Sequence, residues 1–255
     1  MRRRRTILRS IFLLALVALF ARSPALTAGE FTILPLRVAL DRGNRAAEIT
    51  VRNDDSAPLR MQVEAMSWLQ DAEGADRYEA AEGLIYFPRA LEIPPGESRI
   101  VRVGIRAAPV TREETYRLFL EQLPPASTEP PPPGATLRVL LRVGVPVFIA
   151  PPQAERKGEI TGLEIRDGQV RWTVTNAGNV HIAADRVELA ALSRDGTRLH
   201  EQRYQERYFL AGVSRTMQTS IPRKLCSQVF RLEASVFGEG VDLIRKIDVD
   251  PGACK

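Results

Sequence analysis

The sequence is poor in the side chains on which nucleophilic and metal-assisted catalysis depend. Its 255 residues include only two cysteines, Cys226 and Cys254, and two histidines, His181 and His200. None of the four lies in the spacing of a metal site, and the sequence contains no HExxH, no GxSxG and no glycine-rich phosphate loop. We therefore expect no enzyme, no metal ion, no cofactor and no use of ATP. Acid–base chemistry by a pair of carboxylates stays open, although no pair stands out.

His181 is the one histidine with a suggestive position, in the segment GNVHI at the start of an expected strand. A catalytic base needs a partner within hydrogen-bond reach, and the sequence identifies none. We interpret His181 as a hydrogen-bonded structural residue.

The N-terminus lacks an apolar run long enough to cross a membrane. Residues 11–20 form a run of ten, whereas a spanning helix needs about 20 residues. The run is preceded by Arg2, Arg3, Arg4, Arg5 and Arg9 and followed by small residues up to Ala28. This order is typical of a secretory signal peptide, so we expect residues 1–28 to be removed and the protein to be exported.

The chain also lacks a real excess of positive charge once that segment is removed. Six of its 36 basic residues and none of its 31 acidic residues lie in residues 1–28, so 30 basic residues face 31 acidic ones in the exported chain, a net charge of −1. Nothing in this balance favours a nucleic acid as the partner.

Both cysteines survive export and lie within the last thirty residues. In an oxidising compartment an even pair within one domain most simply forms a disulfide. We expect Cys226 to pair with Cys254, which would stabilise the fold by about 3 kcal/mol in the chain-entropy description.

What the sequence does have is alternation, and residues 137–149, LRVLLRVGVPVFI, show it best. Because side chains of a strand alternate between two faces, every odd position falls on one apolar face: Leu137, Val139, Leu141, Val143, Val145, Val147 and Ile149. A typical strand has about five or six residues, so one part of this strand should serve the protein's own fold and another part something else. We expect residues 145–149 to be core and residues 137–143 to form an exposed edge behind the proline-rich loop 124–134, to which no function is assigned.

The rest of the first half reads as short strands separated by turn residues. They are expected at residues 31–40, 46–52, 60–69, 84–91, 99–105 and 116–123. Pro35 interrupts the first one, which suits an edge or a strand that changes sheets. With the strand 137–149 this makes about seven short strands, as in an immunoglobulin-type β-sandwich.

The second half repeats the pattern after residues 150–152, Ala-Pro-Pro. Strands are expected at residues 158–165, 169–175, 179–191, 198–209, 214–221, 228–237 and 241–249, and Asp195-Gly196 is a hairpin signal. The expected fold is all-β, with two immunoglobulin-like β-sandwich domains in tandem. Their bounds are residues 29–150 and 151–255, joined by a short hinge that should hold a fairly fixed angle.

At this level of detail the chain resembles the periplasmic chaperones of the chaperone-usher pilus pathway, the PapD-like family. The resemblance rests on ordered segments: RVAL, VRNDDSAPLRMQVEAMSW, FPRALEIPPGESRIVRV, YRLFLEQLPP, PVFIAPP, TNAGNVHI and YFLAGVSR. It covers nearly all of the exported chain. The PVFI ending and the two cysteines of the second half are more similar to the divergent archaic branch.

The resemblance implies a partner and a mechanism. Such chaperones bind pilus subunits that lack their last strand, lend them their own long strand and deliver them to an outer-membrane usher. Matched to the family, the donated residues are Leu137, Val139 and Leu141, with Val143 a fourth. Each apolar side chain inserted contributes about 1.5–3 kcal/mol, a large part of the roughly 12–16 kcal/mol of nanomolar to picomolar binding. Without a subunit, the edge could self-associate.

The resemblance also implies a cationic cleft that binds the subunit's C-terminal carboxylate. Arg37 matches the family's anchoring arginine, and a guanidinium suits bidentate binding of a carboxylate. The family's second anchor, a lysine, falls on Pro146, which cannot bind a carboxylate. Either Arg37 acts alone, or another cation such as Arg89 or Arg102 has taken that role.

A secreted adhesion or ligand-binding protein with two immunoglobulin-like modules is the alternative. The edge at residues 137–143 separates the two functions. A chaperone needs this row apolar, whereas an adhesin would tolerate Val139→Glu or Leu141→Glu.

Overall fold

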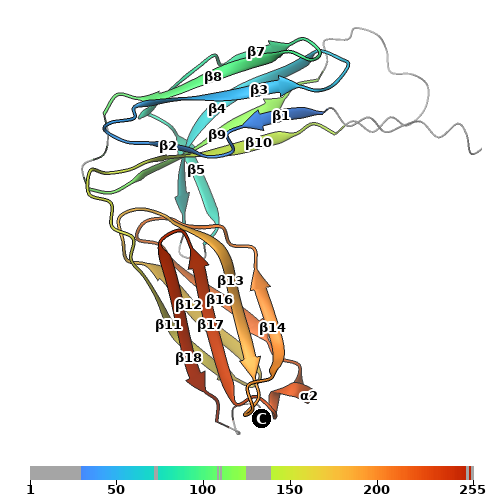
Figure 1. The fold of residues 1–255 in the computed structure, drawn as a ribbon, viewed down its shortest axis with the longest axis vertical. Coiled ribbons are helices and arrows are strands. Elements are labelled where there is room, and N and C mark those ends of the chain that lie inside the picture. The colour runs from blue at the N-terminus through green and yellow to red at the C-terminus, as the bar shows by residue number, and fades with distance from the viewer. Residues whose placement is uncertain are drawn as a thin grey trace, which may run out of the picture.

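The computed structural model describes residues 30–71, 74–107, 109, 111–124, 139–250 and 253. These residues form two β-sandwiches in tandem, which meet at an angle (Figure 1). The predicted fold class is confirmed. The predicted signal peptide, residues 1–28, lies outside the described residues. No helix in the described part of the chain has the length and apolar character that crossing a membrane requires.

The first sandwich consists of two sheets. One has the strand order β1-β3-β8-β6, and the other β2-β10-β9-β4-β5 with β7 also paired to β4. The strands are β1 (Phe31–Leu34), β2 (Val38–Leu40), β3 (Ala46–Asn53), β4 (Leu59–Gln70), β5 (Asp76–Ala80), β6 (Leu84–Phe87), β7 (Ala90–Ile93), β8 (Ser98–Ile105), β9 (Glu114–Gln122) and β10 (Arg142–Ile149).

Pro35 divides the first predicted strand between the two sheets. β1 pairs antiparallel with β3, whereas β2 pairs parallel with β10. Proline has no N–H to give to a sheet ladder, so the chain leaves one sheet before Pro35 and joins the other after it. The prediction of an edge strand or of a change of sheets holds in both respects, because β1 and β2 are also the edge strands of their two sheets.

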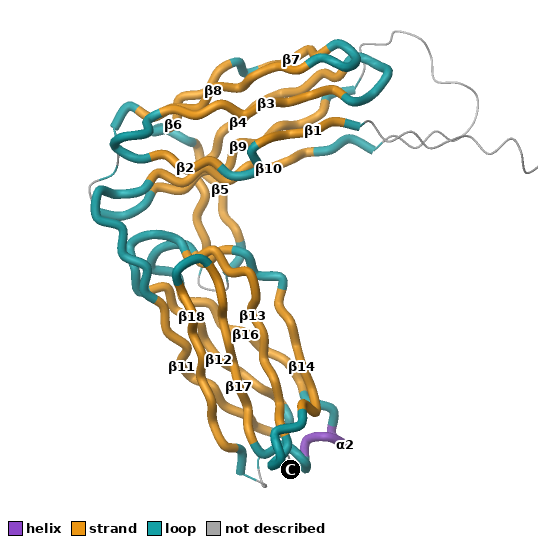
Figure 2. The backbone as a smooth tube through the Cα atoms, viewed as in Figure 1, coloured by secondary structure: helices purple, strands orange, loops and turns teal. Residues whose placement is uncertain are grey.

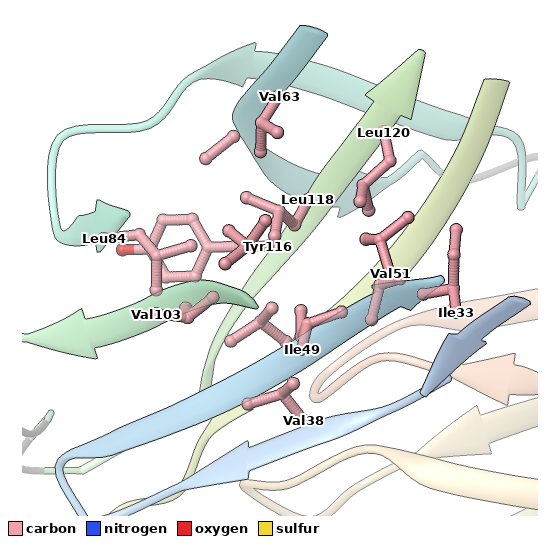
Figure 3. Packing of buried hydrophobic residues seen from close by; sticks show 14 of the residues in the cluster. Ile33, Val38, Ile49, Val51, Val63, Leu84, Val103, Tyr116, Leu118 and Leu120 are labelled. Atoms are coloured by element: carbon pink, nitrogen blue, oxygen red, sulfur yellow. The ribbon is translucent and has the colours of Figure 1, made fainter. Parts of the chain in front are cut away.

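The core between the two sheets is built from the alternating apolar residues that the sequence predicts. Figure 3 shows Ile49 and Val51 of β3 facing Leu118 and Leu120 of β9, all buried. Val145, Val147 and Ile149 of β10 belong to the same core, as predicted.

The second sandwich has sheets of order β11-β12-β16 and β14-β13-β17-β18, with β15 also paired to β13. Its strands are β11 (Gly158–Arg166), β12 (Gln169–Asn176), β13 (Ile182–Leu192), β14 (Arg198–Tyr204), β15 (Tyr208–Phe209), β16 (Ser214–Ser220), β17 (Arg231–Gly238) and β18 (Val241–Asp248). The hairpin predicted at Asp195-Gly196 joins β13 to β14, and Gly196 has the positive φ, 87°, that such a turn favours.

Two elements were not predicted. The short helix α2 (Arg223–Cys226) follows Pro222 and delays the next strand to Arg231. β5 has no counterpart among the predicted strands, because all five of its residues are exposed and no alternation marks it. The β4–β5 hairpin reaches from the first sandwich toward the second (Figure 1), and loops of both sandwiches gather where the two meet (Figure 2).

Candidate functional site

The last strand of the first sandwich, β10, has an open edge. β9 pairs with β10 along its whole length, from Arg142 to Ile149, whereas β2 covers the other edge only from Val147 to Ile149. In the described part of the chain no strand lies beside residues 142–146 on that side. Such an edge offers unpaired main-chain groups to an added strand.

The apolar row of this segment passes from the core to the surface along that edge. Val145 is buried, and Val143 is half-buried and packs against the core. Leu141 and Val139 are 42% and 54% exposed. Leu137 lies outside the described residues. Exposed aliphatic side chains in line with a core row are suited to enter a partner's apolar groove.

The predicted strand of residues 137–149 is too long. β10 begins at Arg142, and residues 139–141 are not strand. The partner strand β9 ends at Gln122, so the ladder stops there, apart from one hydrogen bond from Gln122 N to Leu141 O (2.8 Å).

The opposite face of β10 is polar at its exposed end. The Arg142 guanidinium lies 3.9 Å from the ring centroid of Phe119 and pairs with Glu64 and Glu121 at 3.3 and 3.2 Å. A Cβ on Gly144 would lie 3.0 Å from the Phe119 ring, so glycine is what allows this ring to cover the strand. The apolar row therefore stands on a strand whose other face is solvated.

Toward the second sandwich, the opposite face of β10 becomes apolar. Phe148 packs with Trp68, Tyr208 and Leu210 in a small buried cluster that joins the two sandwiches. Its ring also stacks on His181, with centroids 3.6 Å apart and planes inclined by 14°. One strand thus contributes to the first core through one face and to the interface through the other.

Buried and partly buried polar contacts cross the same interface. The Glu113 carboxylate accepts hydrogen bonds from the His181 backbone N–H (2.8 Å) and lies 2.8 Å from His181 Nδ1. The Gln70 amide donates to Tyr208 O (3.1 Å) and accepts from Leu210 N (3.0 Å). His181 is hydrogen-bonded, as predicted. These contacts oppose changes in the angle between the sandwiches.

Arg37, the predicted carboxylate anchor, also lies where the sandwiches meet. It stands between β1 and β2, and its Nη1 is 3.1 Å from Oε2 of Glu239 in the β17–β18 turn; the two side chains are 45% and 56% exposed. Its guanidinium donates to the Glu239 carboxylate and holds the pKa of that group below its usual value, and Arg156 and His181 act in the same direction.

The other predicted cations lie elsewhere. Arg89 precedes β7 and its guanidinium lies 5.3 Å from the centroid of the Tyr86 ring. β7 and β2 are four strand spacings apart in their sheet, about 19 Å at roughly 4.8 Å each. Arg102 pairs with Glu48 at 3.0 Å on the first sheet. Pro146 is buried in β10. The structure does not bring Arg89 or Arg102 to Arg37.

Three residues of the junction were not among the site residues predicted from the sequence: Glu113, Arg156 and Glu239. Glu239 stands in Gly-Glu-Gly, which looks like any hairpin turn. Arg156 lies in the linker among other charged residues. No local pattern marks them, because their partners come from distant parts of the chain.

Cys226 is buried in the second core and is not a free thiol. Cys254 lies outside the described residues, so its pairing with Cys226 stays a prediction. Among the described residues, no three His, Cys, Asp or Glu side chains gather so as to hold a metal ion.

Comparison with known proteins gives the fold a family. Residues 30–155 match the family "Pili and flagellar-assembly chaperone, PapD N-terminal domain". No curated protein sequence matches the chain.

Solved structures extend the likeness over both sandwiches. The chain is similar to the complex of the chaperone CsuC with the tip subunit CsuE from the archaic Csu pili of Acinetobacter baumannii, with a TM-score of 0.58 and 16% identity over 86% of this chain and 98% of that one. It is also similar to the complex of SafA pilin with the SafB chaperone of Salmonella enterica (TM-score 0.59, 13% identity, 88% and 99% covered). The CupB2 chaperone of Pseudomonas aeruginosa matches with a TM-score of 0.54 and 15% identity over 86% and 100%.

The family is one of assembly chaperones. The matched residues 30–155, which include the first sandwich, therefore belong to the PapD-like family of pili and flagellar-assembly chaperones, and the whole chain has the two-sandwich fold of the solved pilus chaperones.

Proposed function

We propose that this chaperone captures pilus subunits in the periplasm by lending them the open edge of β10, and then delivers them to an outer-membrane usher. The observation that carries the proposal is the apolar row of β10. It leaves its own core at Val143 and continues into solvent at Leu141 and Val139, beside an edge that β2 does not cover.

Strand addition explains why such a row is useful. Main-chain hydrogen bonds along residues 142–146 would hold a subunit's strand, and Val139, Leu141 and Val143 would fill the groove left by the subunit's missing strand. We extend the donated segment to Leu137. Burying each exposed side chain contributes about 1.5–3 kcal/mol, so no ATP is needed for capture.

Arg37 is the proposed anchor for the subunit's C-terminal carboxylate. Its position at the junction supports this role, because a carboxylate there would end a strand lying along β10, and its half-exposed guanidinium can be reached from solvent. If Arg37→Ala left capture and secretion of subunits undiminished, Arg37 would be excluded as the carboxylate anchor.

The remaining features of the proposal concern export. Pilus chaperones act in the periplasm, and the signal peptide at residues 1–28 would take this chain there. The exported chain would then comprise domains 29–150 and 151–255, with a disulfide between Cys226 and Cys254. The archaic branch is our proposed placement within the family.

Charge placed on the exposed row provides the test. The exported chain and its variants Val139→Glu and Leu141→Glu are co-expressed with candidate pilus subunits, and complexes are recovered through a tag on the chaperone. We expect each variant to lose at least tenfold in captured subunit, because a buried unpaired carboxylate in the groove is costly. The control is Ile244→Glu, which charges an exposed apolar side chain of β18 in the second sandwich.

The loss of capture is informative only if Val139→Glu and Leu141→Glu leave the stability of the chaperone unchanged. Because both side chains are exposed, their replacement should alter the free energy of unfolding by less than about 0.5 kcal/mol. Size-exclusion chromatography without a subunit should show self-association of the unmodified chain and less of it for the two variants. Undiminished capture by both variants would overturn the strand-donation mechanism and favour the adhesin.

A further inference from the structure

A carboxylate of the chaperone itself already occupies the predicted carboxylate anchor. Oε2 of Glu239 lies 3.1 Å from Nη1 of Arg37, 202 residues away in the chain. The pair joins the first sandwich to the β17–β18 turn of the second, at the junction of the two (Figure 1).

The backbone of the β17–β18 turn determines where Glu239 lies. Its N–H donates to Ala183 O (3.1 Å). A Cβ on Gly238 would lie only 2.0 Å from the same oxygen, and Gly240 has a φ of 73°. Gly238 is therefore needed for this close approach and Gly240 for the backbone conformation of the turn. The turn is held against β13.

Arg156 approaches the same turn from the linker between the sandwiches. Its Cδ lies 3.4 Å from the position that a Cβ on Gly240 would take. Together with the Arg37 guanidinium it keeps the pKa of Glu239 below its usual value, to which His181 contributes as well. Two guanidinium groups from different parts of the chain thus act on one carboxylate.

We propose that Glu239 takes the place of the subunit's C-terminal carboxylate while the chaperone is empty, and that Arg156 supplies the second cation that the family's strand provides and Pro146 cannot. This inference rests on the proposed function. An arriving carboxylate exchanges for Glu239 on Arg37, so the number of paired charges stays the same.

In this exchange Glu239 competes with the subunit's carboxylate for Arg37 but does not prevent the subunit from binding. Its ion pair is half exposed, and such pairs are weak, so a subunit that also buries apolar side chains along β10 displaces it. Free carboxylates without a strand gain nothing from the exchange. Glu239 therefore restricts the site to a carboxylate at the end of a bound strand.

The test compares two synthetic peptides on the exported chaperone. Both are fluorescein-labelled octapeptides of alternating valine and serine, one with a free C-terminal carboxylate and the other with a C-terminal amide, and binding is measured by fluorescence anisotropy at low ionic strength. We expect Glu239→Gln to tighten binding of the carboxylate peptide about two- to fivefold and to leave the amide peptide unchanged. Arg156→Ala should weaken binding of the carboxylate peptide and leave binding of the amide peptide unchanged.

A matched control variant accompanies the test, and failure of the Glu239 competition can be distinguished from failure of the Arg37 anchor. Glu233→Gln removes a carboxylate of β17, which pairs with Lys246 at 2.8 Å, and should change the binding of neither peptide. One outcome is that Arg37→Ala abolishes the preference for the carboxylate peptide while Glu239→Gln leaves that preference unaltered. This result would overturn competition by Glu239 and would support Arg37 as the carboxylate anchor. If Arg37→Ala leaves the preference intact or no preference exists, the anchor of the proposed function fails.

Discussion

Asn53 and Asn176 occupy equivalent places in the two sandwiches and make the same hydrogen bonds. Each is fully buried at the end of its strand, β3 or β12. Each side-chain oxygen accepts from the backbone N–H two residues on (3.0 Å), and each amide donates to the carbonyl four residues on (2.8 Å). A second donation, at 2.9 Å, goes to a distant carbonyl, that of Ile93 or Phe209.

Asn53→Ala should destabilise the first sandwich by about 3 kcal/mol, because the buried carbonyl of Ile93 and the partly buried carbonyl of Ala57 would both lose their donor. Denaturant unfolding followed by tryptophan fluorescence measures this. Asn44→Ala, which removes an exposed amide that donates to Ala39 O, should change the free energy of unfolding by less than about 0.5 kcal/mol. Equal effects of the two substitutions would show that the buried network is not stabilising.

Phe148→Ala should loosen the junction of the sandwiches. The ring is buried between Trp68, Tyr208 and His181, and removal of a buried phenyl ring typically costs about 3–5 kcal/mol. Calorimetry should show a lower midpoint and a separation of the transitions of the two sandwiches. Phe87→Ala, at a side chain that is 74% exposed, serves as control. If Phe148→Ala lowers the free energy of unfolding by less than about 1 kcal/mol, the cluster around Phe148 does not couple the two sandwiches.

Glu113→Ala should act at the same junction through polar groups. It leaves the buried His181 N–H without its acceptor, and a buried donor without a partner typically costs about 1–3 kcal/mol. Glu97→Ala removes an exposed carboxylate that pairs with Arg99 and should cost at most about 1 kcal/mol. Unfolding in denaturant compares the two, and indistinguishable values would contradict a structural role for the Glu113–His181 contact.

Tyr116 should make the fold sensitive to alkali. Burial, followed by the hydrogen bond that its hydroxyl donates to Glu114, raises the pKa of Tyr116 above its usual value. The unfolded chain then loses this proton first, so the contribution to stability is complete below about pH 10 and is lost as the pH rises toward the folded pKa. Tyr116→Phe should lose less stability than the unmodified chain between pH 8 and pH 11. The same loss in both proteins would contradict the assignment.

The exported chain should contain no free thiol. Alkylation of the unfolded, unreduced protein should add no label by mass spectrometry, and prior reduction should add two, one for each cysteine of the chain. Reduction should also lower the free energy of unfolding by about 3 kcal/mol. Two labels without reductant would exclude the pairing of Cys226 with Cys254.

Alternation of apolar residues was enough to predict most strands, since a side chain's face in a strand depends on local backbone geometry alone. The same signal fails where a strand has no buried face, as in β5, whose residues are all exposed. It also overextends β10, because the composition of residues 139–141 suits a strand while the end of β9 leaves them no partner.

By itself the sequence determined the two sandwiches, the interruption of the first strand at Pro35 and an apolar row too long for one core. Only the tertiary structure decided where that row leaves the core, and that Arg37 faces Glu239 and Glu113 faces His181. Those pairs are 202 and 68 residues apart. Periodicity is a property of neighbouring residues, whereas contacts across a junction arise only when both sandwiches have packed.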